Sequence, residues 1–170
     1  RHEFGGAETA GIKHHYGFKL HIEGNFIRSV TAGHGIWADF INNNWRVEGN
    51  LVLGAGVYAM MAEANDGPNL YANNIFVGGG IGVYSSRADA WVHNLFINAP
   101  QTWVNQDYGG RPAIRDARWV NNVFIGDGLN SSIAPSGSRY SRNVFLDGAA
   151  PHSDDVDAVI GSTPTDVEVL

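Results

Sequence analysis

The chain contains no cysteine. This absence excludes a disulfide framework and a thiolate metal site, but it fits a reducing and an oxidising compartment equally well, so the localisation stays open. Charged residues are also few, at 16% of the 170 residues, whereas hydrophobic residues make up 44%. This composition excludes an extended disordered chain, and the length predicts a single globular domain.

Basic residues and long apolar runs are scarce as well. The 11 Lys and Arg residues are outnumbered by 17 Asp and Glu residues, and the net charge of −6 without a basic cluster argues against a nucleic-acid partner. The longest apolar runs, such as 54–62, fall short of the roughly 18–20 residues that span a bilayer, so we expect no membrane partner. Because the chain starts at Arg1 and stops in a strand-like segment at Leu170, we expect a fragment or a processed product.

A short unit, Asn followed by two apolar residues, recurs along the chain. It begins at Asn25, Asn50, Asn74, Asn94, Asn122 and Asn143, with spacings of 25, 24, 20, 28 and 21 residues. A period near 24 with β-branched and aromatic residues and no helical periodicity indicates one solenoid coil per repeat, and the leucines of a leucine-rich repeat are missing. We therefore predict an all-β, right-handed parallel β-helix of about six coils over residues 1–150, as part of a longer solenoid. Residues 151–170 are expected to form an acidic linker or the start of a C-terminal extension.

The repeated Asn residues have a structural explanation. Each precedes a strand where the chain must turn, and its amide can bind the backbone or the Asn of the next coil. We interpret them as one stacked ladder. The longest spacing predicts a loop at 101–110, because insertions in a solenoid become loops on one face.

Two carboxylates occupy equivalent positions in neighbouring repeats. Because strand side chains alternate between faces, an inward Ile36 and Ala38 place Asp39 on the outer face. Asp39 lies 11 residues before Asn50, and Glu63 lies 11 residues before Asn74, so the two are expected to be aligned on adjacent coils. The same alternation assigns Phe40, Met60, Ala62 and Ala64 inward, and Trp37, Met61, Glu63 and Asn65 outward.

This alignment has an electrostatic cost. Adjacent parallel strands are about 4.8 Å apart, so the carboxyl groups of Asp39 and Glu63 should lie within roughly 5 Å of each other. Like charges that close raise one pKa strongly, and proteins avoid them unless a metal, a shared proton or catalysis compensates. We favour a catalytic pair. The alternatives are ordinary solvated carboxylates and a calcium site, which would need more carboxylates than this alignment offers.

Neighbouring outward residues suit a carbohydrate ligand. Trp37 is a candidate platform for the apolar face of a sugar, with packing under a loop as the alternative. Lys13 and His15 on the preceding coil are candidates for binding hydroxyl groups, with solvated surface as the alternative. Trp45 is expected in the core. The other histidines show no metal-ligand spacing on a common face, so we expect no metal and no cofactor; they are His2, His14, His21, His34, His93 and His152.

Four segments carry a family resemblance: 8–13, 35–39, 46–51 and 63–68. They are similar to the parallel β-helix β-xylosidases of glycoside hydrolase family 120, and the similarity extends over residues 8–98. The resemblance implies that Asp39 is the nucleophile and Glu63 the general acid/base. It also implies that Glu8 contributes to substrate binding beside Lys13, His15 and Trp37.

The leading hypothesis is therefore a retaining glycoside hydrolase that cleaves β-linked xylosides or related short oligosaccharides. The alternatives are a polysaccharide lyase on the same fold, which could recruit Arg46 and Lys13, and a non-catalytic glycan-binding β-helix. Because a solenoid needs covered ends, we also expect a second chain or self-association to cover the first coil, which begins near Gly11.

Overall fold

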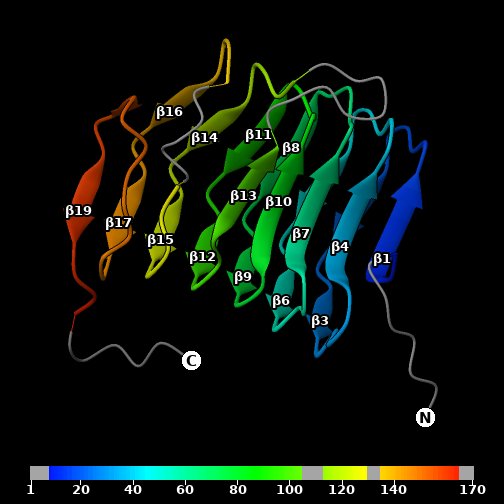
Figure 1. Cartoon of the computed structure of the whole chain (residues 1–170), viewed down its shortest axis with the longest axis horizontal. Helices are drawn as coiled ribbons and strands as arrows, with labels where there is room; N and C mark the ends of the chain where they lie inside the picture. Colours follow the sequence, from blue (N-terminus) through cyan, green and yellow to red (C-terminus); the bar gives the residue numbers. More distant parts are fainter. Residues whose placement is uncertain (1–7, 105–112, 130–134, 165–170) are drawn as a thin grey trace.

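The computed structural model describes residues 8–104, 113–129 and 135–164. In these ranges the chain forms β-strands and no helix, and the strands stack as the coils of a parallel β-helix (Figure 1). The predicted all-β, parallel β-helix fold is confirmed. Among these residues there is consequently no helix that could span a membrane.

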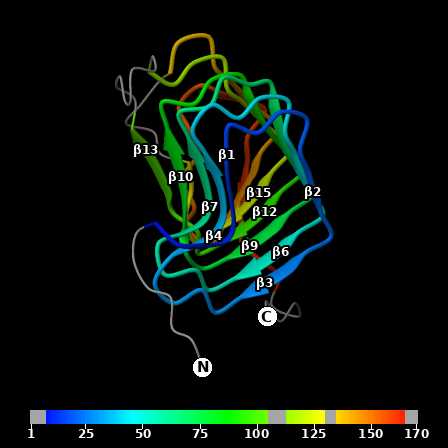
Figure 2. The same ribbon diagram turned by 90° about the vertical axis from the view of Figure 1, so that its right-hand side faces the viewer.

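Three parallel sheets run along the solenoid and enclose its core (Figure 2). The first sheet contains β1 (Ala10–His15), β4 (His34–Asp39), β7 (Tyr58–Glu63), β10 (Gly80–Tyr84) and β13 (Gln101–Val104). The second sheet contains β2 (His21–Glu23), β5 (Arg46–Glu48), β8 (Asn69–Ala72), β11 (Asp89–Val92), β14 (Arg118–Val120), β16 (Arg139–Ser141) and β18 (Asp155–Val156). The third sheet contains β3 (Phe26–Arg28), β6 (Leu51–Leu53), β9 (Ile75–Val77), β12 (Leu95–Ile97), β15 (Val123–Ile125), β17 (Val144–Leu146) and β19 (Val159–Gly161).

Aromatic side chains of successive coils stack inside the solenoid. On the second sheet the ring centroids of Tyr71 and Trp91 are 4.1 Å apart, and those of Trp91 and Trp119 are 4.8 Å apart. A second stack follows the third sheet and contains Phe76, Phe96, Phe124 and Phe145. All of these rings are buried, as is Trp45, which confirms its predicted place in the core. Because each ring packs on the equivalent ring of the next coil, hydrophobic burial fixes the register between coils.

The six repeated asparagines form the predicted ladder between the second and third sheets. The side-chain Nδ2 of Asn50 donates to Oδ1 of Asn74 at 2.9 Å, and Nδ2 of Asn74 donates to Oδ1 of Asn94 at 3.0 Å. The pattern runs from Asn25 to Asn143. The left-handed backbone of each turn falls one residue before the ladder position, at Gly24, Gly49, Asn73, His93, Asn121 and Arg142.

Two inward and outward assignments were wrong because the strands end sooner than the alternation assumed. Phe40 and Ala64 have positive φ angles of 52° and 50°, which break the alternation directly after Asp39 and Glu63. Phe40 is consequently only half-buried, outside the core. Asn65, expected outward, is buried in a second turn, where its Oδ1 accepts hydrogen bonds from the backbone N–H and the side chain of Asn42.

Two segments outside the predicted repeat, the expected loop and the expected linker or C-terminal extension, contain strands. The first part of the expected loop at 101–110 is β13, which pairs with β10, whereas 105–110 lie outside the described residues. Beyond the expected domain boundary at residue 150, β18 and β19 pair with β16 and β17. Asp155 also extends the ladder, because its Oδ2 accepts a hydrogen bond from Asn143 at 2.7 Å. Residues 155–161 therefore continue the solenoid.

Candidate active site on the outer face of the first sheet

The first sheet aligns the predicted carboxylates. Asp39 at the end of β4 is directly opposite Glu63 at the end of β7, and His15 at the end of β1 is opposite Asp39. The alignment inferred from residue counting is therefore confirmed. Lys13 is opposite Trp37, so all five side chains occupy neighbouring outward positions on three adjacent strands.

Asp39 is nearly buried and lies beside two nitrogen groups. Its exposed fraction is 4%, and that of Glu63 is 5%, so the alternative of ordinary solvated carboxylates is wrong. Lys13 Nζ lies 2.9 Å from Asp39 Oδ2, and His15 Nε2 lies 2.5 Å from the same oxygen. Lys13 Nζ also lies 2.8 Å from Oε2 of Glu8, which is largely exposed. Glu8 therefore reaches the site through Lys13.

Lys13 is the positive centre of this arrangement. Burial lowers its pKa, but its hydrogen bonds and attraction to Glu8 and Asp39 outweigh that effect and leave the pKa of Lys13 above its usual value. The hydrogen bond from Lys13, together with its charge, in turn lowers the pKa of Glu8. Lys13 is thus held as an ammonium group, which offsets the negative charge of Asp39 and cannot serve as a neutral base.

Trp37 contacts the second carboxylate. Its indole Nε1 donates a hydrogen bond of 2.9 Å to Oε2 of Glu63, and the ammonium of Lys13 lies 3.5 Å from its ring centroid. The ring is 4% exposed, so Trp37 does not offer an open platform to a sugar. It instead positions Glu63 and packs against Lys13.

A row of aromatic rings beside Trp37 was missed by the sequence analysis. His34 lies between Trp37 and Tyr58, with centroid distances of 4.5 and 5.5 Å, and the hydroxyls of Tyr58 and Tyr84 are 2.7 Å apart. Tyr84 is directly opposite Glu63, and both tyrosines are half-buried. Gly82 makes room for this row, because a Cβ there would come within 2.8 Å of the Tyr58 ring.

A groove of about 530 Å³ lies elsewhere, along the second sheet. Asn69, Asp89 and Arg118 contribute to its lining, and neither Asp39 nor Glu63 does. Asp89 is buried, and its carboxylate accepts hydrogen bonds from Asn69 at 2.9 Å and from Ser86 at 2.5 Å. Burial raises its pKa to about 7, although those two hydrogen bonds act in the opposite direction. Because the hydrogen bond from Asn69 joins neighbouring coils and the one from Ser86 closes a local turn, we assign Asp89 a structural role.

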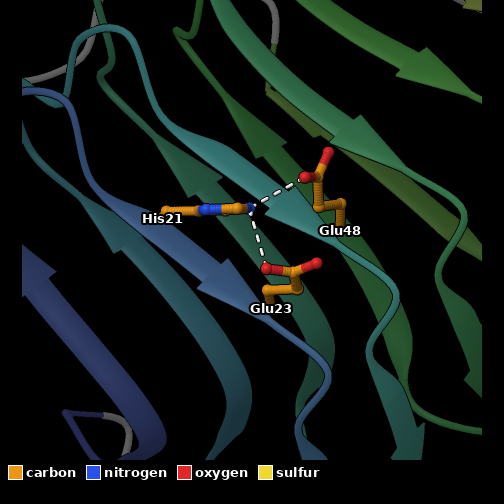
Figure 3. A group of neighbouring side chains, drawn as sticks. All are labelled: His21, Glu23 and Glu48. Carbon is orange, nitrogen blue, oxygen red and sulfur yellow. Dashed lines mark hydrogen bonds and ion pairs between the residues drawn. The ribbon is translucent and has the colours of Figure 1, made fainter.

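One histidine does share a face with carboxylates, contrary to the sequence analysis. His21, Glu23 and Glu48 meet on the outer face of the second sheet (Figure 3). The sequence could have placed Glu23 and Glu48 together, because the spacing of 25 residues between them equals that between Asn25 and Asn50. This group is separate from Asp39 and Glu63, which lie on the first sheet.

Comparisons of the chain with protein-family models, curated proteins and solved structures found no match. The resemblance to the β-xylosidases therefore stays a prediction, and a functional assignment depends on the geometry of the site.

Proposed function

We propose that this chain is a retaining glycoside hydrolase acting on β-linked xylosides or related short oligosaccharides. The observation that carries the proposal is the alignment of Asp39 and Glu63 on adjacent strands of one outer face. Strands in such a sheet are about 4.8 Å apart, which suits the separation of about 5–5.5 Å between the carboxyl groups of retaining enzymes better than the 6.5–9.5 Å of inverting ones.

The contacts suggest which oxygen atom of each carboxylate would take part in the reaction. Lys13 and His15 both bind Oδ2 of Asp39, so Oδ1 would attack the anomeric carbon. Trp37 binds Oε2 of Glu63, so the transferable proton would be on Oε1. Attack forms a glycosyl ester with Asp39 while the glycosidic C–O bond breaks, and Glu63 protonates the departing oxygen. Glu63 then takes a proton from water, which cleaves the ester.

Sugar recognition would use the partly exposed groups around this pair. Lys13 and His15 have side-chain exposures of 20% and 50%, and they can donate hydrogen bonds to hydroxyl groups. Tyr84, which is half-buried and directly opposite Glu63, would take the stacking role first expected of Trp37, together with Tyr58, whose hydroxyl contacts that of Tyr84. Glu8 would act by orienting Lys13.

A non-catalytic glycan-binding function is the second candidate. Both carboxylates are nearly completely buried, and Asp39 forms an ion pair with Lys13. These contacts also suit a structural role of the carboxylates, which favours this candidate over hydrolysis. A polysaccharide lyase is less well supported, because the raised pKa of Lys13 disfavours the neutral amine that would serve as its base.

Hydrolysis of aryl β-glycosides separates the two candidates. The intact chain should release the aryl group from a pentoside, and Asp39→Asn should abolish turnover while the protein still unfolds cooperatively. Asp154→Asn is a matched control, because that carboxylate is 67% exposed and lies near the last described coil. Binding of xylo-oligosaccharides without hydrolysis by the intact chain would instead support the glycan-binding function.

A further inference from the structure

The second sheet carries a compact group of metal-ligating side chains on its outer face. His21 and Glu23 are two residues apart on β2, so both point to the same face. Glu48 on β5 is directly opposite Glu23, which brings a second carboxylate to the group. Figure 3 shows the three side chains converging.

The distances suit one ion. His21 Nε2 lies 2.8 Å from Glu48 Oε1 and 3.7 Å from Glu23 Oε2, and one ligand atom from each residue lies within 4.8 Å of the other two. Tetrahedral zinc with ligands at about 2.0–2.1 Å separates those ligands by about 3.3 Å. Small side-chain adjustments would therefore convert the hydrogen-bonded group into three coordination bonds.

Arg46 supports the carboxylate of Glu48 from outside the group. Its Nη2 lies 2.9 Å from Glu48 Oε2, whereas His21 contacts the other oxygen, Oε1. A hydrogen-bonded carboxylate oxygen of this kind orients the remaining oxygen toward a metal.

We propose that His21, Glu23 and Glu48 bind a divalent first-row transition ion. Zn²⁺ is the ion with which the site can be tested. The imidazole nitrogen favours such an ion over Ca²⁺ and Mg²⁺, which prefer oxygen ligands. The side chains of His21 and Glu23 are 44% and 65% exposed, so water can complete the coordination sphere. Because the group lies on a different sheet from Asp39, the site is independent of the proposed hydrolase activity.

Calorimetric titration of the full chain with ZnCl₂, after removal of metals with a chelator, tests this site. We expect saturable binding that weakens at least tenfold in both His21→Ala and Glu48→Gln. His93→Asn should bind as the unchanged chain does, because His93 is an exposed histidine outside the group. Zinc should also raise the unfolding temperature of the unchanged chain but not that of His21→Ala.

Four results would overturn the proposal. One is the absence of saturable zinc binding, and another is equal affinity in the unchanged chain and His21→Ala. The third is tighter binding of Ca²⁺ than of Zn²⁺, which would show that oxygen atoms alone determine the preference. Loss of binding in His93→Asn would place the ion elsewhere and would count against the site in the same way.

Discussion

Two carboxylates on adjacent strands repel each other, and in this protein each one has a different partner that offsets the repulsion. Asp39 has Lys13 and His15 on the coil before it, whereas Glu63 accepts the indole N–H of Trp37. Asp39 thus lies beside the ammonium group of Lys13, and Glu63 accepts a hydrogen bond from the indole of Trp37. Different surroundings of this kind suit a nucleophile and a proton donor, which need different environments.

Glu63→Gln tests the role of the proton donor at the residue scale. The variant should lose about 10²–10⁴-fold in kcat on substrates with poor leaving groups, because those need protonation of the departing oxygen. Aryl glycosides with acidic leaving groups should be affected much less in the bond-breaking step. Steady-state kinetics across a series of leaving groups measures the difference, and an equal loss for every leaving group would contradict the assigned role.

Asp89→Asn should change how stability depends on pH. The unfolded chain loses this proton near pH 3.8, whereas the folded chain keeps it until about pH 7, so the unfolded state binds fewer protons between these values. Asp89 therefore makes stability fall as pH rises from about 4 to 7, by up to about 4 kcal/mol. The Asn variant mimics the neutral side chain and should lack this decline.

Urea unfolding of both proteins at several pH values measures this effect. The free energy of unfolding of Asp89→Asn relative to the unchanged chain should rise between pH 4 and 8. A difference that stays constant over this range would show that Asp89 does not titrate as described.

The asparagine ladder can be tested at the scale of one structural element. Asn74→Ala removes the oxygen that accepts from the backbone N–H and side chain of Asn50, and the donor to the carbonyl of Val47. These groups are buried, so the loss should be at least about 3 kcal/mol. Asn25→Ala, at the half-buried start of the ladder, should cost only about 1 kcal/mol. Equal losses in urea unfolding would show that the ladder does not act through burial.

The sequence was informative where one residue type recurs and uninformative where the backbone turns. Counting from the ladder asparagines aligned Asp39 with Glu63, because both strands end at the same distance from their Asn. The same counting could not place Tyr84 opposite Glu63, because Tyr84 lies 10 residues before Asn94 whereas Glu63 lies 11 residues before Asn74. It also could not show that Phe40 adopts a left-handed backbone, which bulky residues rarely do.

The contacts of the site were harder to predict than its alignment. Alternation placed Trp37 on the outer face, but an outward direction does not specify exposure. The burial of Trp37 depends on Lys13 lying over its ring and on its hydrogen bond to Glu63, and both contacts join different coils. The rotamers that make such contacts are not encoded in the spacing of residues.

At the scale of the whole molecule, the first described coil presents unpaired strand edges and exposed apolar side chains. Tyr16, Phe18 and Phe26 are 67%, 64% and 59% exposed. Open edges of this kind favour pairing with another chain, so we expect the 170-residue chain to self-associate through this coil. Sedimentation velocity should show a concentration-dependent dimer that Phe18→Lys weakens. Ile75→Lys, at a 39% exposed apolar residue on a middle coil, should leave it unchanged, and a folded species that stays monomeric at all concentrations would contradict the expectation.

The stereochemistry of hydrolysis tests the central claim most directly, because it reports the relation between the two carboxylates during the reaction. Proton NMR of the first sugar released from an aryl β-xyloside distinguishes the two anomers before they interconvert. If Asp39 forms a glycosyl-enzyme and Glu63 then activates water, the first product is the β-anomer, with retained configuration. An α-anomer as the first product would contradict both the mechanism and the roles of Asp39 and Glu63.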